Sequence, residues 1–296
     1  MNAIIASTDF SPSATHAVHY AAALAQSVGA RLVLFHHFTY PVPATDLPIL
    51  QPLVYVDEMT VGYEHRLGEI KTELARQYEG LEIDLAVRSL LLQEDLEELV
   101  QAEKADLVVM GAKGHSPVAN ALFGSVASKA VRRGKLPLLL VPSECTFQPY
   151  KKILFPCDNH FVPNVQVVEA LKSIAVAFDA YIEVLTLKQG TEMEALAVAP
   201  TPEKPHKSNL SLLLGKIKHG FSYEYRESIE SGILDEAMRS HADLVAMVPH
   251  HHSLLSGLLN TSETQRLATI IKVPLLVLGE RVPIAEEETV AIDAAL

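Results

Sequence analysis

The chain has 296 residues, about twice the length of a typical domain, so two compact units are expected. Hydrophobic residues make up 49% and charged residues 20% of the sequence, which excludes an intrinsically disordered chain. The formal net charge of −12, without a long basic run, argues against direct nucleic-acid binding. Since no apolar run approaches the roughly 20 residues of a spanning helix, no membrane insertion is expected either.

The first segments alternate between strand and helix. An apolar run at residues 2–8 predicts a buried strand and not a signal peptide, because no basic leader precedes it. Ser11 and Pro12 then indicate the start of a helix that ends near Gly29, since serine is a good N-cap and proline fits the first helical position. A second strand is predicted at residues 31–38.

The remainder of the first half continues this alternation. The proline-rich segment 41–52 is incompatible with a regular helix, so it is predicted to be a loop over the sheet edge. Unbroken apolar runs at 105–111 and 137–142 predict two fully buried strands. Strands that alternate with helices predict an α/β fold, with a parallel sheet covered on both faces. Further predicted elements are helices at 58–79, 94–104 and 124–134 and a strand at 82–87.

The second half of the chain repeats the first. The segment KKILFPCD at 151–158 matches NAIIASTD at 2–9, and ADLVAMV, which starts at 242, follows ADLVVMG, which starts at 105, by 137 residues. The runs PLLLV and PLLVL, which start at 137 and 274, are separated by the same offset. These matches predict a tandem duplication with a short linker. Its predicted parts are repeat 1 at 1–143, repeat 2 at 151–279 and an acidic tail at 280–296.

A glycine-rich loop lies between the last two strands of repeat 1, with the sequence GAKGHSPVANALFGSVASKAV. Two residues separate Gly111 from Gly114, nine separate Gly114 from Gly124, and Ser125 follows. Glycines let the backbone approach a ligand closely, and a helix that begins at Gly124 presents free N–H groups and a positive dipole end. The loop is therefore predicted to bind a phosphate chain. Turn formation alone would explain two isolated glycines but not four matched positions.

This spacing resembles the nucleotide-binding branch of the universal stress protein family, whose hallmark is glycine, two residues, glycine, nine residues, glycine, then serine or threonine. The strand order, Asp9 after the first strand and the closing PLLLVP also agree, so the resemblance covers nearly the whole chain. It implies two tandem Rossmann-like open parallel sheets of five strands, of the adenine nucleotide alpha hydrolase-like kind. It also implies ATP as ligand, in some members with magnesium or manganese. The residues implied are Thr8, Asp9 and His37 near the base, Met110 near the ribose or base, and Gly114, Gly124, Ser125, Val126 and Ala127 along the phosphates.

General physical considerations favour the same location. Ligands of open parallel sheets bind outside the carboxyl ends of the strands, where Asp9, His37 and Gly111 are expected to converge. Lys113 either supplies a cationic contact to phosphate or points into solvent. Asp9 has an alternative role as a cap of the helix that starts at Pro12, and Ser125 has one as an N-cap. Capping by Ser125 is compatible with ligand contact.

Repeat 2 lacks the glycines of this loop. At the offset of 137 residues only the final hydroxyl residue is retained, and side chains stand where a phosphate chain needs bare backbone. ATP binding by repeat 2 is therefore not expected, although Asp158 still matches Asp9. The replacements are Val248 for Gly111, His251 for Gly114, Thr261 for Gly124 and Ser262 for Ser125.

Histidines and cysteines suggest no metal or redox site. His250 to His252 are predicted to lie in a surface loop, because adjacent imidazoles seldom reach one ion. Neighbours in a strand point to opposite faces, so one of His36 and His37 is predicted to be buried and hydrogen-bonded. Cys145 and Cys157 lack the spacing of a disulfide framework or a zinc site, and they are interpreted as structural residues in a reducing cytoplasm.

The predicted function is ATP binding in a stress-response regulatory module, because the chain shows no nucleophile–base–acid grouping and no Walker loop. One alternative is a slow ATPase or phosphotransfer enzyme that uses Lys113, His115 and a divalent ion. Another is a scaffold or carrier that holds an apolar ligand in repeat 2. The resemblance further implies that the strands at 137–142 and 274–278 pair antiparallel within one chain, covering two apolar edges. Association of two chains as a homodimer is left open.

Overall fold

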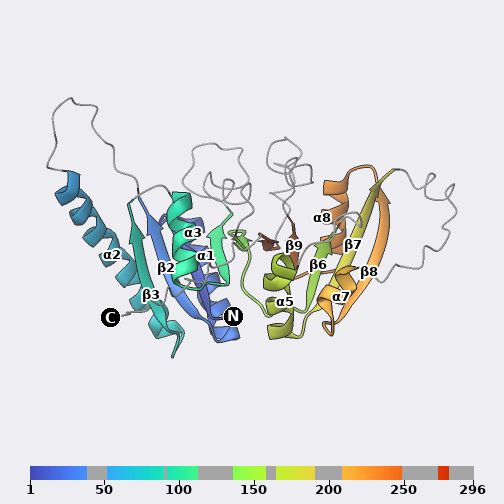
Figure 1. Ribbon diagram of the computed structural model, residues 1–296, viewed down its shortest axis with the longest axis horizontal. Helices are drawn as coiled ribbons and strands as arrows, with labels where there is room; N and C mark the ends of the chain where they lie inside the picture. Colours follow the sequence, from blue (N-terminus) through green and yellow to red (C-terminus); the bar gives the residue numbers. More distant parts are fainter. Residues whose placement is uncertain are drawn as a thin grey trace, which may run out of the picture.

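The structure, a computed structural model, describes residues 1–38, 52–89, 92–112, 136–157, 165–190, 209–248 and 273–279. Its strands form one ten-stranded sheet in the order β3-β2-β1-β4-β5-β10-β9-β6-β7-β8 (Figure 1). The elements of repeat 1 are β1 (Ala3–Ser7), α1 (Pro12–Val28), β2 (Arg31–His37), α2 (Pro52–Gln77), β3 (Ile83–Arg88), α3 (Leu92–Ala102), β4 (Leu107–Gly111) and β5 (Leu138–Val141).

The two halves of the sheet have the same strand order, and they are joined so that the second half runs in the reverse direction across the sheet. Counted from its own first strand, each half has the order 3-2-1-4-5, and all neighbours within a half pair parallel. The predicted α/β class and tandem organisation are therefore confirmed. The elements of repeat 2 are β6 (Lys152–Pro156), α5 (Val165–Phe178), β7 (Tyr181–Gln189), α7 (Asn209–Leu214), β8 (His219–Arg226), α8 (Ile229–Arg239), β9 (Leu244–Met247) and β10 (Leu275–Val277).

Two helix boundaries test the sequence reading directly. The prediction for α1 is confirmed, because the Ser11 hydroxyl accepts from the Ala14 N–H (3.2 Å), Pro12 is the first helical residue and Gly29 ends the helix at φ 67°. The predicted start of the next helix at 58 is wrong, since α2 begins at Pro52. Proline is compatible with a first helical turn, so it started this helix where the sequence reading placed a loop. The predicted helix at 124–134 and the tail at 280–296 lie outside the described residues.

The helices cover the sheet in two layers. Alternate strand residues point to opposite faces, so Ile4 belongs to one hydrophobic cluster and Ile5 to another. The first cluster contains buried residues of α1, α2, α5 and α7, and the second contains residues of α3 and α8. Both clusters include residues from the two repeats, so the core is continuous across the molecule. No helix in the described ranges has the length and apolarity needed to cross a bilayer.

The duplicated ADLV segments make the same backbone contacts in both repeats. The Asp106 carboxylate accepts a hydrogen bond from the Asn2 N–H, and Asp243 accepts one from the Lys151 N–H (2.7 Å). The Asp106 N–H donates to the Ala3 carbonyl and the Asp243 N–H to the Lys152 carbonyl, both at 2.9 Å. The internal repeat of the sequence thus preserves the start of each first strand.

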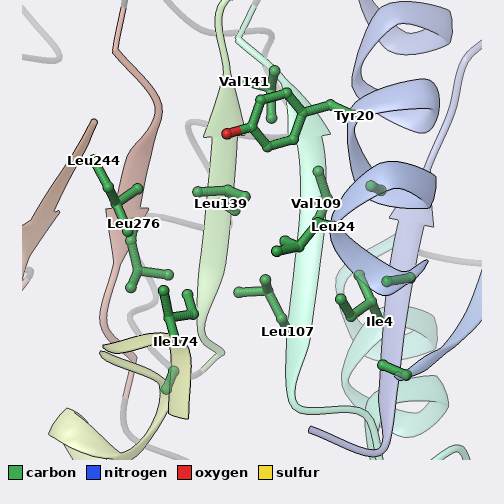
Figure 2. Packing of buried hydrophobic residues seen from close by; sticks show 14 of the residues in the cluster. Ile4, Tyr20, Leu24, Leu107, Val109, Leu139, Val141, Ile174, Leu244 and Leu276 are labelled. Atoms are coloured by element: carbon green, nitrogen blue, oxygen red, sulfur yellow. The ribbon is translucent and has the colours of Figure 1, made fainter. Parts of the chain in front are cut away.

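The two repeats join through an antiparallel strand pair, as expected from the closing strands. Leu139 of β5 lies opposite Leu276 of β10, and both are 0% exposed. Figure 2 shows these two side chains next to each other, between Leu244 on one side and Leu107 on the other. Because the pair covers an edge of each repeat, the sheet continues through the junction.

The linker between the repeats is tied to α1. The His16 ring Nε2 lies 2.7 Å from the Cys145 carbonyl oxygen, and the Tyr20 and Tyr150 hydroxyls share a buried hydrogen bond of 2.8 Å. Phe147 packs edge-on against both tyrosine rings. Burial raises the pKa of the Cys145 thiol to about 11, which keeps it protonated at neutral pH and fits a structural role.

Removing one hydroxyl of the tyrosine pair should cost more than removing both. Tyr150→Phe leaves the buried Tyr20 hydroxyl without its partner, so it should lower the free energy of unfolding by about 1–3 kcal/mol. The double variant Tyr20→Phe/Tyr150→Phe should lose less than the single variant. Urea unfolding followed by circular dichroism measures both, and equal losses in the two variants would contradict a direct bond.

The same pair should make the chain sensitive to alkali. Burial, and then the neighbouring tyrosine, raise the pKa of the Tyr20 hydroxyl above its ordinary 10.0, and burial raises that of Tyr150. A raised folded-state pKa gives stability that is complete below the unfolded value and is lost as the pH rises above it. The free energy of unfolding should therefore fall above about pH 10, and less steeply in the double phenylalanine variant.

Candidate functional site

The candidate site lies at the carboxyl edge of β1, β2 and β4. Ser7 of β1 lies opposite Phe35 of β2, and Ala6 lies opposite Val109 of β4. The chain continues from β1 to β2 on one side, whereas β4 lies on the other side, so the strand order reverses between β1 and β4. Open α/β sheets bind ligands in the crevice outside such a reversal.

The turn from β1 into α1 is held by successive hydrogen bonds. The Thr8 N–H donates to the Phe35 carbonyl (2.8 Å), and the Phe10 N–H donates to the Thr8 hydroxyl oxygen (3.0 Å). The Ser11 N–H donates to Asp9 Oδ1 (2.9 Å), which fixes the exposed Asp9 side chain at the start of the helix. The helix cap itself is the Ser11 hydroxyl, so the Asp9 bond orders the residue before the helix and leaves the carboxylate at the edge of the sheet.

Phe10 has a backbone conformation that bulky residues rarely adopt. Its φ of 62° lies in the left-handed region, which costs about 1–3 kcal/mol for a residue other than glycine. Its ring contacts the His36 ring, with centroids 4.5 Å apart, and the Arg66 guanidinium lies 3.8 Å from its centroid. These contacts stabilise the strained turn that carries Asp9.

The two adjacent histidines of β2 differ in environment. His36 is buried, and its Nδ1 lies 2.8 Å from the Thr8 carbonyl oxygen. The prediction of one buried, hydrogen-bonded histidine is therefore confirmed. His37 is partly exposed and ends the strand on the opposite face, which Val33 and Phe35 also face in the cluster of α3. Met110 belongs to that same cluster, so His37 and Met110 lie on one face of the sheet.

Gly111 ends β4 where α1 begins. A Cβ at this position would lie 2.7 Å from Ser13 Oγ, 2.8 Å from its carbonyl oxygen and 2.9 Å from its carbonyl carbon. The first turn of α1 therefore packs directly against the end of β4. The sequence suggested ligand approach as the reason for this glycine, whereas the structure supplies helix–strand packing as an independent reason.

Of the residues predicted to contact the nucleotide, the structure describes Thr8, Asp9, His37, Met110 and Gly111. All five lie at or beside the carboxyl edge of β1, β2 and β4. The predicted phosphate contacts follow Ala112 and lie outside the described residues. They are Lys113, Gly114, Gly124, Ser125, Val126 and Ala127.

The equivalent edge of repeat 2 keeps the backbone bond at the end of its first strand, and a threonine takes the place of His36. The Cys157 N–H donates to the Leu185 carbonyl (2.9 Å), as Thr8 does to Phe35 in repeat 1. The Thr186 hydroxyl donates to the Cys157 carbonyl (3.3 Å), which replaces the histidine contact of repeat 1. Val248 follows β9 and is partly buried against the core. The other positions of repeat 2 that the sequence singled out lie outside the described residues: Asp158, His250, His251, His252, Thr261 and Ser262.

Cysteines and metal ligands add nothing at this edge within the described ranges. Cys145 and Cys157 are both free thiols. A search of the described residues finds no cluster of three or more histidine, cysteine, aspartate or glutamate side chains that could hold a metal ion.

Sequence reasoning missed Phe10, Ser13 and Tyr63 as part of this region and left His36 unresolved. The Tyr63 ring of α2 lies 4.2 Å from the His36 ring, a contact between elements far apart in the sequence. Local pattern carries no signal for such a contact. Comparing the repeats would have related His36 to Thr186, but not shown what either residue binds.

The comparisons with known proteins agree with this architecture. The model of the universal stress protein family matches residues 1–142 and 149–279. The universal stress protein Rv2005c of Mycobacterium tuberculosis is 23% identical over 252 residues, which span 78% of this chain and 83% of that protein. A universal stress protein of Thermus aquaticus is 33% identical over 141 residues, 47% of this chain and 96% of that protein.

A solved structure has the same fold over nearly the full length. The universal stress protein of Archaeoglobus fulgidus superposes with a TM-score of 0.65 at 15% identity, over 94% of this chain and 98% of that chain. The family model accounts for almost all of the chain in two successive segments, which agrees with the two repeats of the sheet. The chain therefore belongs to the universal stress protein family.

Proposed function

We propose that repeat 1 binds ATP at the carboxyl edge of β1, β2 and β4, and that the bound nucleotide acts as a signal in a cytoplasmic stress response. The observation that carries the proposal is the place in the sheet where the glycine motif begins. Gly111 ends β4 beside β1, where the strand order of the sheet reverses and ligands of such sheets bind. Bound ATP would change contacts with partner proteins, and rapid hydrolysis is not part of this role.

The described residues fit the base side of a nucleotide. The Asp9 carboxylate is exposed at the edge and held by the Ser11 N–H, so it can accept a hydrogen bond from an amino or hydroxyl group. His37 and Met110 share one face of the sheet beside it. We propose contacts with the phosphates along the motif, and a magnesium or manganese ion would neutralise part of their charge. These contacts involve Gly111, Lys113, Gly114, Gly124, Ser125, Val126 and Ala127.

Repeat 2 is proposed to bind no ATP. Val248 stands where repeat 1 has Gly111, and a β-branched side chain there takes up the space that the glycine leaves to Ser13 in repeat 1. The repeats would then divide their roles, with nucleotide binding in repeat 1 and completion of the sheet by repeat 2.

Titration calorimetry of the full chain with ATP and Mg²⁺ tests the proposal. One nucleotide per chain is expected. Gly114→Val and Gly124→Val should each weaken binding by at least about a hundredfold, because a side chain would enter the phosphate path. Gly257→Val changes a glycine of repeat 2 outside the motif and is the matched control, with affinity unchanged. His251→Gly should not create a second site.

Absence of binding at millimolar ATP would overturn the proposal, and two nucleotides per chain would overturn the assignment to repeat 1 alone. Labelled ATP with Mg²⁺ separates binding from turnover. Product formed faster than in a Lys113→Ala variant would favour the slow-enzyme alternative. Mass spectrometry of an extract of the purified chain separates a bound nucleotide from an apolar cargo.

A further inference from the structure

A cluster of rings surrounds a buried acceptor next to the candidate site. His36, Phe10, Phe38 and Tyr63 form this ring cluster, and the His36 ring lies 4.5 Å from Phe10, 6.5 Å from Phe38 and 4.2 Å from Tyr63 between centroids. His36 is only 6% exposed, and among the described residues its Nε2 has no hydrogen-bond partner. A buried acceptor without a partner is unfavourable and calls for an explanation.

The contacts of His36 determine where its proton lies. The Thr8 carbonyl oxygen can only accept a hydrogen bond, so His36 Nδ1 carries the proton that it donates at 2.8 Å. In the neutral ring Nε2 is then an unprotonated acceptor. The aromatic side chains that pack against this buried ring accommodate a neutral imidazole far better than a charged one. The cluster therefore favours the neutral, Nδ1-protonated ring.

The ring cluster also determines the shape of the turn that carries Asp9. Phe10 holds a φ of 62° while its ring packs against His36, and its N–H donates to the Thr8 hydroxyl oxygen. Thr8 is thus bonded through its carbonyl to His36 and through its hydroxyl to Phe10. Asp9 lies between these two residues, so its position depends on both contacts.

Helix α2 reaches the same turn from outside. Tyr63 stacks on the Phe10 ring with centroids 6.0 Å apart, and the Arg66 guanidinium lies over the Phe10 ring, 3.8 Å from its centroid. A cation over an aromatic face is attracted to it. The path from α2 to Asp9 therefore runs through the Phe10 and His36 rings.

Repeat 2 makes the equivalent bond without a titratable group. The Thr186 hydroxyl donates to the Cys157 carbonyl oxygen at 3.3 Å, in the place where His36 donates to Thr8. A hydroxyl is therefore sufficient to link the second strand to the end of the first. The histidine of repeat 1 adds a titratable ring to this link, and repeat 1 is also the repeat with the complete glycine motif.

We propose that His36 is a positioning residue which, in its neutral form, holds Thr8, Asp9 and Phe10 in the conformation that accepts a nucleotide, and releases this turn when Nε2 gains a proton. The proposal rests on the proposed nucleotide site of repeat 1. His36 does not contact the nucleotide itself. Its effect on binding passes through the Thr8 carbonyl and the Phe10 ring.

The charges near the ring give the direction of the pH dependence. Burial, assisted by His37 and Arg66, lowers the pKa of His36 below its ordinary 6.5, while the Thr8 carbonyl and Asp9 oppose this shift. Tyr63 contributes an uncharged ring. A lowered folded-state pKa means that the neutral arrangement is complete above about pH 6.5 and is lost as the pH falls through the folded value. Nucleotide affinity should fall in the same direction.

The first experiment uses the ligand-free full chain and nuclear magnetic resonance. The ¹⁵N shifts of His36 should report a proton on Nδ1 at neutral pH, and the amide signals of Asp9 and Phe10 should titrate with the same midpoint as the ring. In the His36→Thr variant these amide signals should no longer titrate with the midpoint of the His36 ring. Amide signals that ignore the ring titration, or a proton on Nε2 at neutral pH, would overturn the proposal.

The second experiment measures ATP affinity against pH in three variants. His36→Thr keeps a donor of the kind found in repeat 2, so its affinity near pH 7.5 should stay within about threefold. His36→Val has a side chain of the same size as the threonine variant but no donor, and this variant should bind ATP about fivefold more weakly. Thr186→Val removes the corresponding hydrogen bond of repeat 2, so it should lower the free energy of unfolding and leave the ATP affinity unchanged.

The decisive quantity is the ratio of affinities between the unmodified chain and His36→Thr, because protonation of ATP itself cancels in this ratio. The unmodified chain should lose on the order of tenfold relative to the variant between about pH 7.5 and about pH 5. Parallel pH profiles would refute the positioning role even if ATP binds. If no ATP binds at any pH but the amide signals follow His36, the proposed function fails and the positioning role stands.

Discussion

Replacing Gly111 with alanine is expected to lower the free energy of unfolding by about 2–3 kcal/mol, although only one methyl group is added. The added Cβ would lie within 2.9 Å of the carbonyl oxygen and carbon of Ser13, closer than real Cβ contacts allow. Since backbone cannot rotate away as a side chain can, α1 must shift from the end of β4. Urea unfolding followed by circular dichroism measures the loss.

The same substitution elsewhere supplies the control. Gly62 lies in α2, and a Cβ there would meet nothing within 4 Å. Gly62→Ala should therefore raise the free energy of unfolding by about 0.5–1 kcal/mol through helix propensity. A second test separates backbone from side chain, because Ser13→Ala removes only the hydroxyl oxygen. If this change restored the stability of Gly111→Ala, the clash would involve the hydroxyl alone and the argument for close helix–strand packing would fail.

The position of Gly111 has a consequence for the candidate site. Packing against Ser13 brings the first turn of α1 to the point where the glycine motif begins. Free N–H groups of a first helical turn favour anions, so this close approach is compatible with the proposed phosphate path. The same glycine is thus required by the fold and, in the proposal, by the ligand. A loss of binding in a Gly111 variant would not separate these roles, which is why the binding test uses Gly114 and Gly124.

The sequence predicted the fold well because the duplication supplied the same information twice. Asp106 and Asp243 occur at matching positions of the repeated ADLV segments, and each accepts a backbone N–H from the start of a first strand. The apolar runs of β5 and β10 indicated their burial, and the family resemblance implied their antiparallel pairing, which the structure confirms with Leu139 opposite Leu276. Local signals and tertiary packing agree at these positions.

The candidate site was predicted less completely, for physical reasons. Asp9 and Gly111 belong to patterns that are visible along the chain. Phe10 gave no signal, because an aromatic residue at a φ of 62° contradicts its local preference and is held there by His36 and Tyr63. Alternation along β2 indicated that one histidine is buried, but the choice of His36 depended on the position of α2, whose start the sequence reading placed six residues late.

Replacing Leu276 with aspartate is expected to lower the free energy of unfolding by about 4 kcal/mol or more, because a charge would lie unpaired in the core. Leu276 is 0% exposed and lies between Leu139 of β5 and Ala246 of β9, so all three strands lose contacts. Val176→Asp is the control, since this side chain of α5 is 69% exposed and Lys172 lies one helical turn before it. The control should change stability by less than about 1 kcal/mol.

Beyond stability, Leu276→Asp should change how the chain associates. β10 pairs with β5 on one side and with β9 on the other, and its loss would leave β5 with an open edge of buried apolar residues. Unpaired edges of this kind recruit other strands, so size-exclusion chromatography should show dimers or larger species that the Val176→Asp control does not form. An unaltered monomer fraction together with full stability would mean that β5 and β10 do not pair in solution.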